Sequence, residues 1–508
     1  MEQIGIIDMG SNSIRFVIYE IDEYKCYKEI QNLKIPARLS TYIDDEGAMT
    51  KDGIDKVLET LKRFEPVVAN YELSSMRGVA TAAIRNATNS EEILDAIKEH
   101  SIFPVDILSE EQEAYYGYLA VTNSMDVPEG ITIDIGGGST EVTYFKDREL
   151  LHSYSFPFGA LTLKKQFIKG DTPTEEEWKR LRDFLKESYR SLSWIKDKNV
   201  PVIGIGGSAR NVAQVHQADI SYPMSGLHQY EMTAKEVHDI SDELSSMSLK
   251  KREKVDGLSK DRADTILPAI AAMEALIKEV NTKSFIVSSR GLRDGLFFEL
   301  LLAPIEVTHF PNVKEESFYQ LSNYYRLNLD HQKKISVLAS YLTSELVEHD
   351  LVTLSKLDME HLRLGANVFY IGNTIHPESK SEHTFYLLTN QSIDGLPHSE
   401  RLAVAFIASF KSKSQLKKYA DPYRPWVSKE DLVQYELLGA IIKFSFALNI
   451  SEQSIIKRTE ITECDKEDIT ITVTYDGDAF FEEEQANKYK KHLEKALDKN
   501  ITLTFNHV

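Results

Sequence analysis

Short apolar runs alternate with helix-like repeats in the first part of the chain. Residues 3–8, with Ile4, Ile6 and Ile7 at the centre, are typical of a buried strand, and residues 53–70 repeat apolar side chains every three or four positions, which is typical of a helix. The pattern starts again at Gly130. We expect strands at 3–8, 14–20, 76–80, 104–108, 131–135, 139–146, 149–156, 201–205 and 283–287, and helices at 53–70, 111–122, 174–196, 207–216 and 261–280.

The alternation ends near Pro304 and Pro311. Helical periods dominate from about 314 to 448, and the tail predicts strands at 468–475 and 501–505 with a helix near 483–498 between them. A chain of 508 residues, 42% hydrophobic and 27% charged, is long and apolar enough for three or four domains.

Charge and cysteine content narrow the class of protein. Lys and Arg number 59 against 79 Asp and Glu, which gives a formal charge of −20 and argues against proteins that coat nucleic acids or membrane surfaces. The two cysteines, Cys26 and Cys464, lack the spacing of a zinc site or a disulfide framework. The N-terminus does not resemble a signal peptide, and no run of about eighteen apolar residues occurs. We therefore expect a cytoplasmic protein that neither crosses a membrane nor binds nucleic acid.

Two glycine turns repeat one pattern. IDMGSNS at 7–13 and IDIGGGST at 133–140 each run from an apolar strand through Asp, a spacer and Gly into small or hydroxyl residues. Such turns can point successive backbone N–H groups at a phosphate, because glycine has no Cβ to hold the oxygens away. Two copies predict a cleft between two related domains, with Asp8 and Asp134 near a divalent cation that offsets their repulsion of phosphate. A third turn, IGIGGSARN at 203–211, opens a helix and can add an anion-binding helix N-terminus.

Seven segments resemble, in the same order, the exopolyphosphatase and guanosine pentaphosphate phosphohydrolase family, within the superfamily of actin-like proteins, sugar kinases and heat-shock ATPases. They are DMGSNSIR from residue 8, ATAAIRNA from 80, LSEEQEAYYGYLAV from 108, DIGGGSTE from 134, GIGGSARN from 204, DRADTILPA from 261 and GLRDG from 291. The resemblance implies an α/β fold: two actin-like (ribonuclease H-like) domains at 1–125 and 126–305 that form a cleft, a helical His-Asp-like domain at 306–448 and a small α+β domain at 449–508. It also implies a homodimer.

The resemblance implies catalytic roles for Glu113 and Arg85. Glu113 corresponds to the family's base, which orients and deprotonates the attacking water. Glu110, which stands where the family usually has glycine, and Glu111 lie within the same helical turn and stay open as alternatives. Arg85 corresponds to the arginine that holds the terminal phosphate, a task that suits a planar guanidinium; a surface arginine that caps a helix is the alternative.

Metal and substrate residues follow from the same resemblance. Asp134 and Glu141 correspond to magnesium carboxylates, Asp8 can add a third oxygen, and potassium is often needed by the family. Residues of the turns are implied to hold substrate phosphates: Ser11, Asn12, Ser13, Gly137, Gly138, Ser139, Gly207, Ser208 and Arg210, with Gly206 beside them. Arg15 lies two residues past the first turn on a strand, so we expect its side chain to face the same way as Ser13 and to reach the cleft. Arg262, Asp264 and Arg293 can contact the substrate, but a role in a structural salt bridge is at least as well supported for each of them.

The helical part departs from the family pattern at its central helix. Phe369 and Tyr370 stand where a metal-binding module would have His-Asp, and His331 and His383 alone are too few to hold a metal. We expect this part to form a wall of the substrate channel or a dimer face. Basic residues that can grip a long polyanion are Lys164, Lys165, Lys169, the run LKKREK at 249–254, Lys411, Lys413, Lys417, Lys418 and Arg424, although such runs are usually solvated surface.

The sequence therefore predicts an exopolyphosphatase that removes terminal orthophosphate processively from inorganic polyphosphate, with magnesium and with water activated by Glu113. A guanosine pentaphosphate 5′-phosphohydrolase needs the same cleft and remains an alternative. A sensor that binds polyphosphate or nucleotide without turnover is a second alternative, which an intact Glu113 disfavours.

Overall fold

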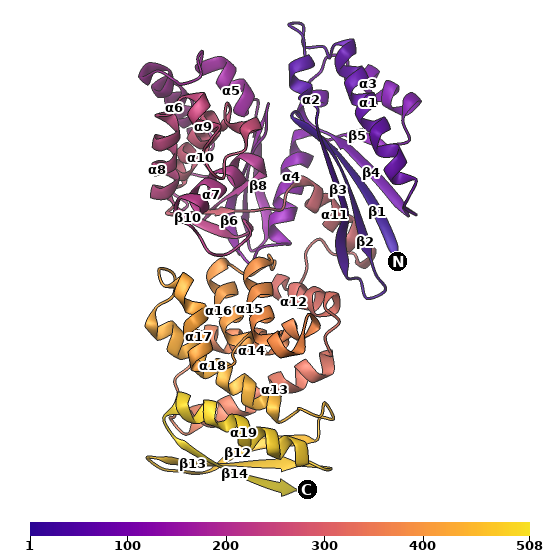
Figure 1. Ribbon diagram of the computed structural model, residues 1–508. Helices are drawn as coiled ribbons and strands as arrows, with labels where there is room; N and C mark the ends of the chain where they lie inside the picture. Colours follow the sequence, from indigo (N-terminus) through magenta and orange to yellow (C-terminus); the bar gives the residue numbers. More distant parts are fainter. The chain divides into compact units, whose positions relative to one another are not determined.

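The computed structural model describes residues 1 to 508, which divide into two compact units (Figure 1). The first unit comprises Met1–Tyr222 and Leu227–Val313, and the second comprises Pro223–Gly226 and Lys314–Val508. None of the helices is long and apolar enough to span a membrane.

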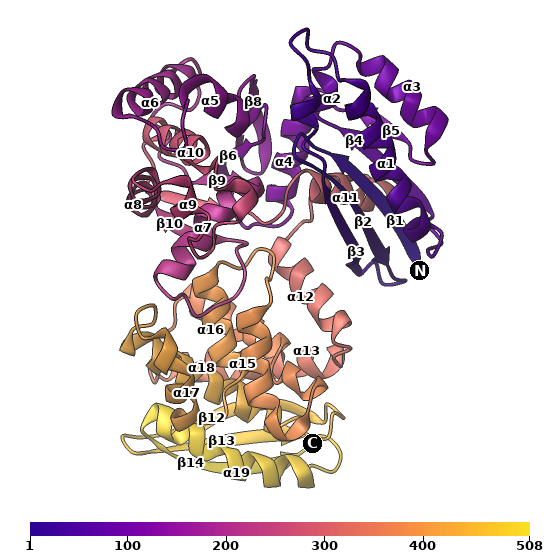
Figure 2. The same cartoon turned by 45° about the horizontal axis from the view of Figure 1, so that its top comes forward.

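The first half of unit 1 is a five-stranded sheet in the order β3-β2-β1-β4-β5. Strand β1 is buried along most of its length, as its apolar sequence predicts, and pairs antiparallel with β2 and parallel with β4. Helices α1 and α3 lie against this sheet (Figure 2), and their apolar side chains belong to the same core as those of its strands. The elements are β1 (Glu2–Met9), β2 (Ser13–Ile21), β3 (Tyr27–Pro36), η1 (Leu39–Tyr42), α1 (Lys51–Val68), β4 (Ser75–Ala80), α2 (Ala82–Arg85), α3 (Ser90–His100), β5 (Val105–Ile107) and α4 (Glu110–Thr122).

The second half of unit 1 is a six-stranded sheet in the order β10-β11-β9-β6-β7-β8. The side chains of α5 to α8 and α10 pack with its strands into one core. The elements are β6 (Glu129–Ile135), β7 (Thr140–Lys146), β8 (Glu149–Phe156), α5 (Ala160–Phe167), α6 (Glu175–Arg190), β9 (Val202–Ile205), α7 (Gly206–Asp219), β10 (Tyr230–Thr233), α8 (Ala234–Ser245), α9 (Leu249–Arg252), η2 (Lys260–Arg262), α10 (Ile266–Val280), β11 (Ser284–Val287), α11 (Leu292–Leu302) and η3 (Ala303–Ile305).

Helices α4 and α11 join the two halves of unit 1. A third core contains side chains from β1 and β2, from both helices and from β7 and β9. The two helices approach closely at Gly295, where a Cβ atom would lie 2.0 Å from the backbone oxygen of Tyr116. Residues at the start of α4 therefore have positions fixed by both sheets.

Unit 2 is helical from α12 to α18 and ends in a three-stranded sheet in the order β12-β13-β14. Helix α19 lies beside this sheet (Figure 2). Its elements are α12 (Val313–Tyr324), α13 (Leu329–Glu348), α14 (Lys356–Asn367), η4 (Ile371–Thr374), η5 (Pro377–Ser379), α15 (Lys380–Asn390), α16 (His398–Ala408), α17 (Lys413–Ala420), η6 (Asp421–Tyr423), α18 (Lys429–Ala447), β12 (Ile456–Cys464), β13 (Asp468–Tyr475), α19 (Phe480–Leu497) and β14 (Asn500–His507).

The predicted elements all have counterparts, but two helix predictions were wrong at one end. The helix expected at 174–196 ends at Arg190, and residues 193–197 form a turn instead. The helix expected at 261–280 begins only at Ile266, because residues 260–262 form the separate 3₁₀ helix η2. Prediction missed β3, β10, β12, α2, α3, α5, α8, α9 and α11.

Candidate active site

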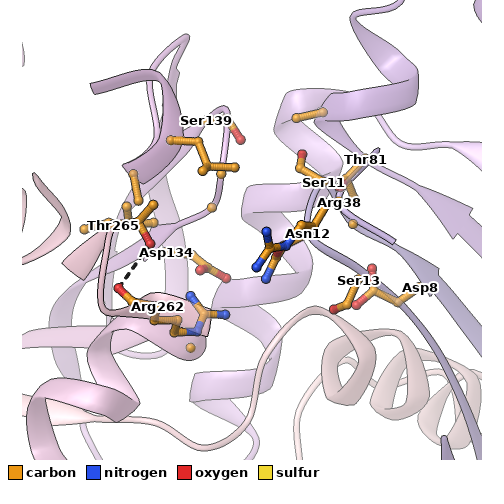
Figure 3. A pocket seen from close by; sticks show the side chains of 18 of the residues that line it. Asp8, Ser11, Asn12, Ser13, Arg38, Thr81, Asp134, Ser139, Arg262 and Thr265 are labelled. Atoms are coloured by element: carbon orange, nitrogen blue, oxygen red, sulfur yellow. Dashed lines mark hydrogen bonds between the residues drawn. The ribbon is translucent and has the colours of Figure 1, made fainter. Parts of the chain in front are cut away.

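The two glycine turns have matching backbone geometry and line one cavity of about 330 Å³ (Figure 3). In the first turn the N–H of Gly10 donates to the oxygen of Ser13 at 3.1 Å, and in the second the N–H of Gly136 donates to the oxygen of Ser139 at 3.0 Å. Ser11, Asn12, Ser13, Gly137 and Ser139 line this cavity, and Gly138 belongs to the same second turn.

The strand registers place the acidic residues at equivalent positions. Asp8 of β1 lies opposite Arg15 of β2, and Asp134 of β6 lies opposite Glu141 of β7. Asp8, Asp134 and Glu141 all line the cavity. The repeated sequence pattern therefore corresponds to a repeated structure. The paired positions are Asp8 and Arg15 in the first half and Asp134 and Glu141 in the second.

Helix α4 brings Glu113 to the cavity from the junction of the two halves. Ser109 and Gln112 form a capping box, in which the Ser109 hydroxyl accepts from the backbone of Gln112 and the Gln112 side chain accepts from the backbone of Ser109. This cap fixes the first turn of α4. Of its three glutamates only Glu113 lines the cavity, while Glu111 is exposed to solvent.

Arg85 lies behind Glu113. Its Nη1 donates to Oε2 of Glu113 at 2.7 Å and to the backbone oxygen of Leu108 at 3.2 Å. The Nε and Nη2 atoms of Arg85 are buried and have no hydrogen-bond partner. Buried guanidinium donors without partners are costly. Arg85 does not itself line the cavity; Glu113 lies between it and the cavity.

Burial raises the pKa of Glu113 to about 7, although the bond from Arg85 and its positive charge act in the opposite direction. The negative charges of Asp134 and Asp8 add to the increase. A carboxyl group with a pKa near neutrality can accept a proton during a reaction and release it afterwards.

The remaining carboxylates are also held in a low-dielectric environment. Burial raises the pKa values of Asp8, Asp134 and Glu141, and the charges of Glu113 and Asp134 raise that of Glu141 further. Such mutual repulsion is relieved when a divalent cation binds among hard oxygen ligands. No group of three or more His, Cys, Asp or Glu side chains is gathered closely enough to hold a metal ion by itself.

Asp8 already has a partner, because Nη1 of Arg293 lies 3.0 Å from its Oδ2. The structural salt bridge that sequence analysis left open for Arg293 is therefore present. Asp264 similarly pairs with Lys164 at 3.4 Å at the edge of the cavity. Arg262 makes no ion pair and lines the cavity, with one long hydrogen bond of 3.4 Å to the Ser208 hydroxyl.

Arg15 and Arg210 do not line the main cavity. They line an adjoining cavity of about 300 Å³, together with Lys34, Arg262 and Arg293. Both cavities share Ser13, Gly207, Asp261 and Arg262. Five cations surround this small space, and burial followed by the charge of Arg293 lowers the pKa of Arg210 to about 10. Positive charge is therefore concentrated beside the main cavity.

Sequence analysis missed Arg38, whose side chain projects into the main cavity from the first half of unit 1 (Figure 3). Arg38 has a left-handed backbone with φ 48° and ψ 44°, which is uncommon for a residue other than glycine. Its N–H donates to the oxygen of Asn12 at 2.9 Å, and its oxygen accepts from the Thr41 hydroxyl at 2.8 Å. Its guanidinium has no partner. The strained backbone at the rim of the cavity identifies Arg38 as a candidate site residue. A sequence pattern does not show backbone strain.

Gly206 shows why a third glycine turn lies beside the cavity. Its φ is 81°, and a Cβ atom there would lie 2.3 Å from Oδ1 of Asp134. Only glycine allows α7 to begin so close to this carboxylate. Gly207, at the next position, lines both cavities, and Ser208 is buried behind it.

In unit 2, the segment that would carry the His-Asp pair packs as an aromatic cluster. The ring of Phe369 lies 5.5 Å and that of Tyr370 5.7 Å from the ring of Phe446. His331 is buried, and its Nδ1 lies 2.8 Å from the side-chain amide of Asn449. These residues form packing contacts here.

The fold and the cavity define the class of the protein. It is an actin-like α/β protein in which two related halves surround glycine turns and carboxylates. A sequence profile of the Ppx/GppA phosphatase family matches residues 17–303, and a profile of Ppx/GppA phosphatase domain III matches residues 313–493. The chain belongs to the Ppx/GppA phosphatase family, as the sequence resemblance predicted.

Individual relatives agree with this assignment. Exopolyphosphatase 1 of Mycobacterium tuberculosis is 27% identical over 305 residues, which cover 59% of this chain and 88% of the relative. The crystal structure of the Aquifex aeolicus member of the Ppx/GppA family is 29% identical, with a TM-score of 0.54, and covers 60% of this chain and 99% of that chain. An exopolyphosphatase from Cytophaga hutchinsonii, at 22% identity and a TM-score of 0.54, covers 61% of this chain and 100% of its own, and supports the fold alone.

Proposed function

We propose that this protein is an exopolyphosphatase, which hydrolyses the terminal phosphoanhydride bond of inorganic polyphosphate and repeats the step along the chain. The observation that carries the proposal is the buried Arg85–Glu113 pair beside two facing glycine turns. Family membership and a relative named exopolyphosphatase support the same reaction class.

In the proposed reaction the turns hold the terminal phosphate through backbone N–H groups and the hydroxyls of Ser11 and Ser139. The unpartnered Nε and Nη2 donors of Arg85 bind oxygens of this phosphate and stabilise the charge that develops on them. Glu113 accepts the proton of a water molecule as its oxygen attacks phosphorus. The new P–O bond forms as the anhydride P–O bond breaks, and its electron pair leaves with the shortened chain.

Magnesium fits the donor set of the cavity. Asp134 and Glu141 carry hard oxygen atoms whose mutual repulsion a cation would reduce, and Asp8 is paired with Arg293. Magnesium usually binds to one or two protein carboxylates, several waters and substrate phosphates, which suits a site without three gathered ligands. When bound, the ion would neutralise phosphate charge and polarise the reacting bond.

The adjoining basic cavity supports a substrate with more than one phosphate. Arg15, Arg210 and Arg262 can bind phosphates beyond the reacting one, and this contact would hold the shortened product for another cycle. The same cavity suits the phosphates of guanosine pentaphosphate, so it does not choose between the two substrates.

Parallel measurement of phosphate release tests the proposal. Long-chain polyphosphate, tripolyphosphate and guanosine pentaphosphate are offered at equal concentrations of cleavable ends, and the highest kcat/KM is expected for polyphosphate. A preference for guanosine pentaphosphate would replace the proposed substrate by the nucleotide. Binding of all three without release, including in single-turnover experiments, would mean that the protein is a sensor.

A further inference from the structure

Three side chains of unit 1 form a closed ring of hydrogen bonds outside the two cavities. They are Arg77 of β4, Tyr116 of α4 and Glu299 of α11. Nη1 of Arg77 donates to Oε2 of Glu299 at 2.9 Å, and Nη2 of Arg77 donates to the phenol oxygen of Tyr116 at 3.0 Å. The Tyr116 phenol in turn donates to the same Glu299 oxygen at 2.9 Å. None of the three residues lines the main or the adjoining cavity, and the proposed reaction uses none of them.

Tyr116 is the buried member of this ring. It is 3% exposed, whereas the side chains of Arg77 and Glu299 are 31% and 36% exposed. Burial, and then the bond to Glu299, raise the pKa of Tyr116 to about 12, so the phenol keeps its proton at neutral pH. The phenol therefore accepts from a guanidinium and donates to a carboxylate at the same time. Such charge-assisted bonds are shorter and stronger than neutral ones.

Each element in the ring also carries a residue of the candidate active site. Strand β4 leads into Thr81, which lines the main cavity, and Arg85 ends the short helix that follows. Helix α4 has Glu113 one turn before Tyr116. Helix α11 has Arg293, which lines the adjoining cavity. The ring thus connects the same elements that supply the site.

Hydrophobic packing does not by itself fix the rotation of α4 about its axis. Every residue from Tyr116 to Thr122 is buried, and apolar side chains of this helix pack with strands of both sheets. The hydrophobic effect is non-directional, so a helix that is buried all round loses little apolar contact when it turns. Hydrogen bonds are directional. A rotation of α4 would lengthen the bonds that Tyr116 makes to β4 and α11.

We infer that Tyr116, held between Arg77 and Glu299, is a positioning residue that sets the rotation of α4 and so directs the Glu113 carboxylate to Arg85 and the main cavity. The segment from β4 to α2 is joined to α4 at two points, because Arg85 bonds Glu113 and Arg77 bonds Tyr116. Loss of the second link lets α4 turn, which lengthens the first. The role rests on the proposed function, since Glu113 has to be the base.

Tyr116→Phe tests this role, because it removes the phenol hydroxyl and leaves the ion pair of Arg77 and Glu299 in place. On polyphosphate it should lower kcat about tenfold and change KM by less than about twofold, since the phosphate-binding turns are untouched. Arg85 lowers the pKa of Glu113, and a longer bond between them weakens this effect. The acidic limb of kcat/KM should therefore move to higher pH by about half a unit. A merely structural role would not move this limb.

Tyr115→Phe is the matched control. It removes the same atom from the neighbouring residue of α4, whose side chain is half-buried and lies outside both cavities. Its kcat should stay within about twofold of the parent, and its acidic limb should not move. Glu299→Leu should lower kcat as Tyr116→Phe does. Glu299→Gln should recover most of kcat, because an amide oxygen still accepts from the phenol.

Titration of Glu113 separates this inference from the proposed function. The carbon NMR signal of its carboxyl group is the one that Glu113→Gln removes, and its midpoint pH is measured without turnover in the parent, Tyr116→Phe and Tyr115→Phe. If the parent releases no phosphate, the proposed function fails, while an upward shift confined to Tyr116→Phe still supports the positioning role. A parent-like kcat or an unchanged midpoint in Tyr116→Phe, equal changes in the two tyrosine variants, or a Glu299→Gln variant as impaired as Glu299→Leu would each overturn it.

Discussion

Nη1 of Arg85 lies 2.7 Å from Oε2 of Glu113, and the two side chains are only 11% and 16% exposed. The pair joins the end of α2 to the first turn of α4. One group of the pair is the candidate base and the other the candidate phosphate ligand, so a phosphate that binds to the free donors of Arg85 would lie next to Glu113.

Glu113→Gln should lower kcat on polyphosphate by about two to four orders of magnitude, because the amide keeps the shape and the bond from Arg85 but cannot accept a proton. Substrate affinity should change little. Glu111→Gln is the matched control, since Glu111 lies in the same turn but is exposed, and its rate should stay within about twofold of the parent. A parent-like rate for Glu113→Gln would move the base to another residue.

The same substitution should stabilise the fold at alkaline pH. The pKa of Glu113 is about 7 in the folded chain, above its ordinary value of 4.5. Between these two pH values the folded state therefore keeps a proton that the unfolded state has already released. Stability therefore falls as pH rises from about 4.5 to about 7 and then stays constant. Glu113→Gln removes this loss, on the order of 1–3 kcal/mol above pH 7.

Denaturant titrations of parent and variant at pH 4 and pH 8 measure this effect. The two proteins should unfold at the same midpoint at pH 4, and the variant should unfold at a higher denaturant concentration at pH 8. A difference independent of pH would mean that the carboxyl group titrates normally.

Asp134→Asn and Glu141→Gln should each raise the magnesium concentration needed for half-maximal activity by roughly tenfold or more, because each removes a charged oxygen from the buried set. Asp147→Asn is the control: Asp147 is exposed in the turn after β7, and its left-handed backbone, φ 51°, suits asparagine. Titrations with and without potassium would show whether a monovalent ion is also required. Parent-like magnesium dependence in both acidic variants would place the metal elsewhere.

Local patterns made much of the site predictable. Asp8, Asp134 and the glycine turns were found because a strand, an acid and a glycine follow one another within a few residues, and the structure pairs them as two similar hairpins. Glu113 was placed on the correct helix, and the capping box at Ser109 explains why that helix starts where it does.

Contacts between distant segments could not be predicted in the same way. The Asp8–Arg293 pair joins residues 285 positions apart. Strand β3 was missed because its residues alternate between exposed and half-buried without a continuous apolar run. The spacing of residues along the chain does not show which distant segments come into contact in the folded protein.

Arg38 should contribute to substrate binding through its charge and not through its backbone. Arg38→Gly removes the guanidinium and also relieves the left-handed conformation, so it should raise KM for polyphosphate by about tenfold while leaving thermal stability unchanged or higher. Arg38→Lys keeps a charge and should recover part of the affinity. Unchanged KM in Arg38→Gly would mean that the side chain only lies in the cavity.

Gly295→Ala should reduce activity by displacing α4. A Cβ at this position would lie 2.0 Å from the Tyr116 oxygen and 3.0 Å from the Tyr116 Cα, so α4 and α11 must separate to admit it. Glu113 precedes Tyr116 by one helical turn and would move away from the turns that hold phosphate, and a displacement of about 1 Å can lower kcat by about a hundredfold. Gly117→Ala is the control, because its nearest neighbour, Cδ1 of Ile205, lies at an ordinary 3.5 Å and alanine favours the helix. Melting temperature and kcat are measured for both variants. The expected result is a lower melting temperature and kcat for Gly295→Ala alone; similar values in the two variants would show that the junction of α4 and α11 does not position the base.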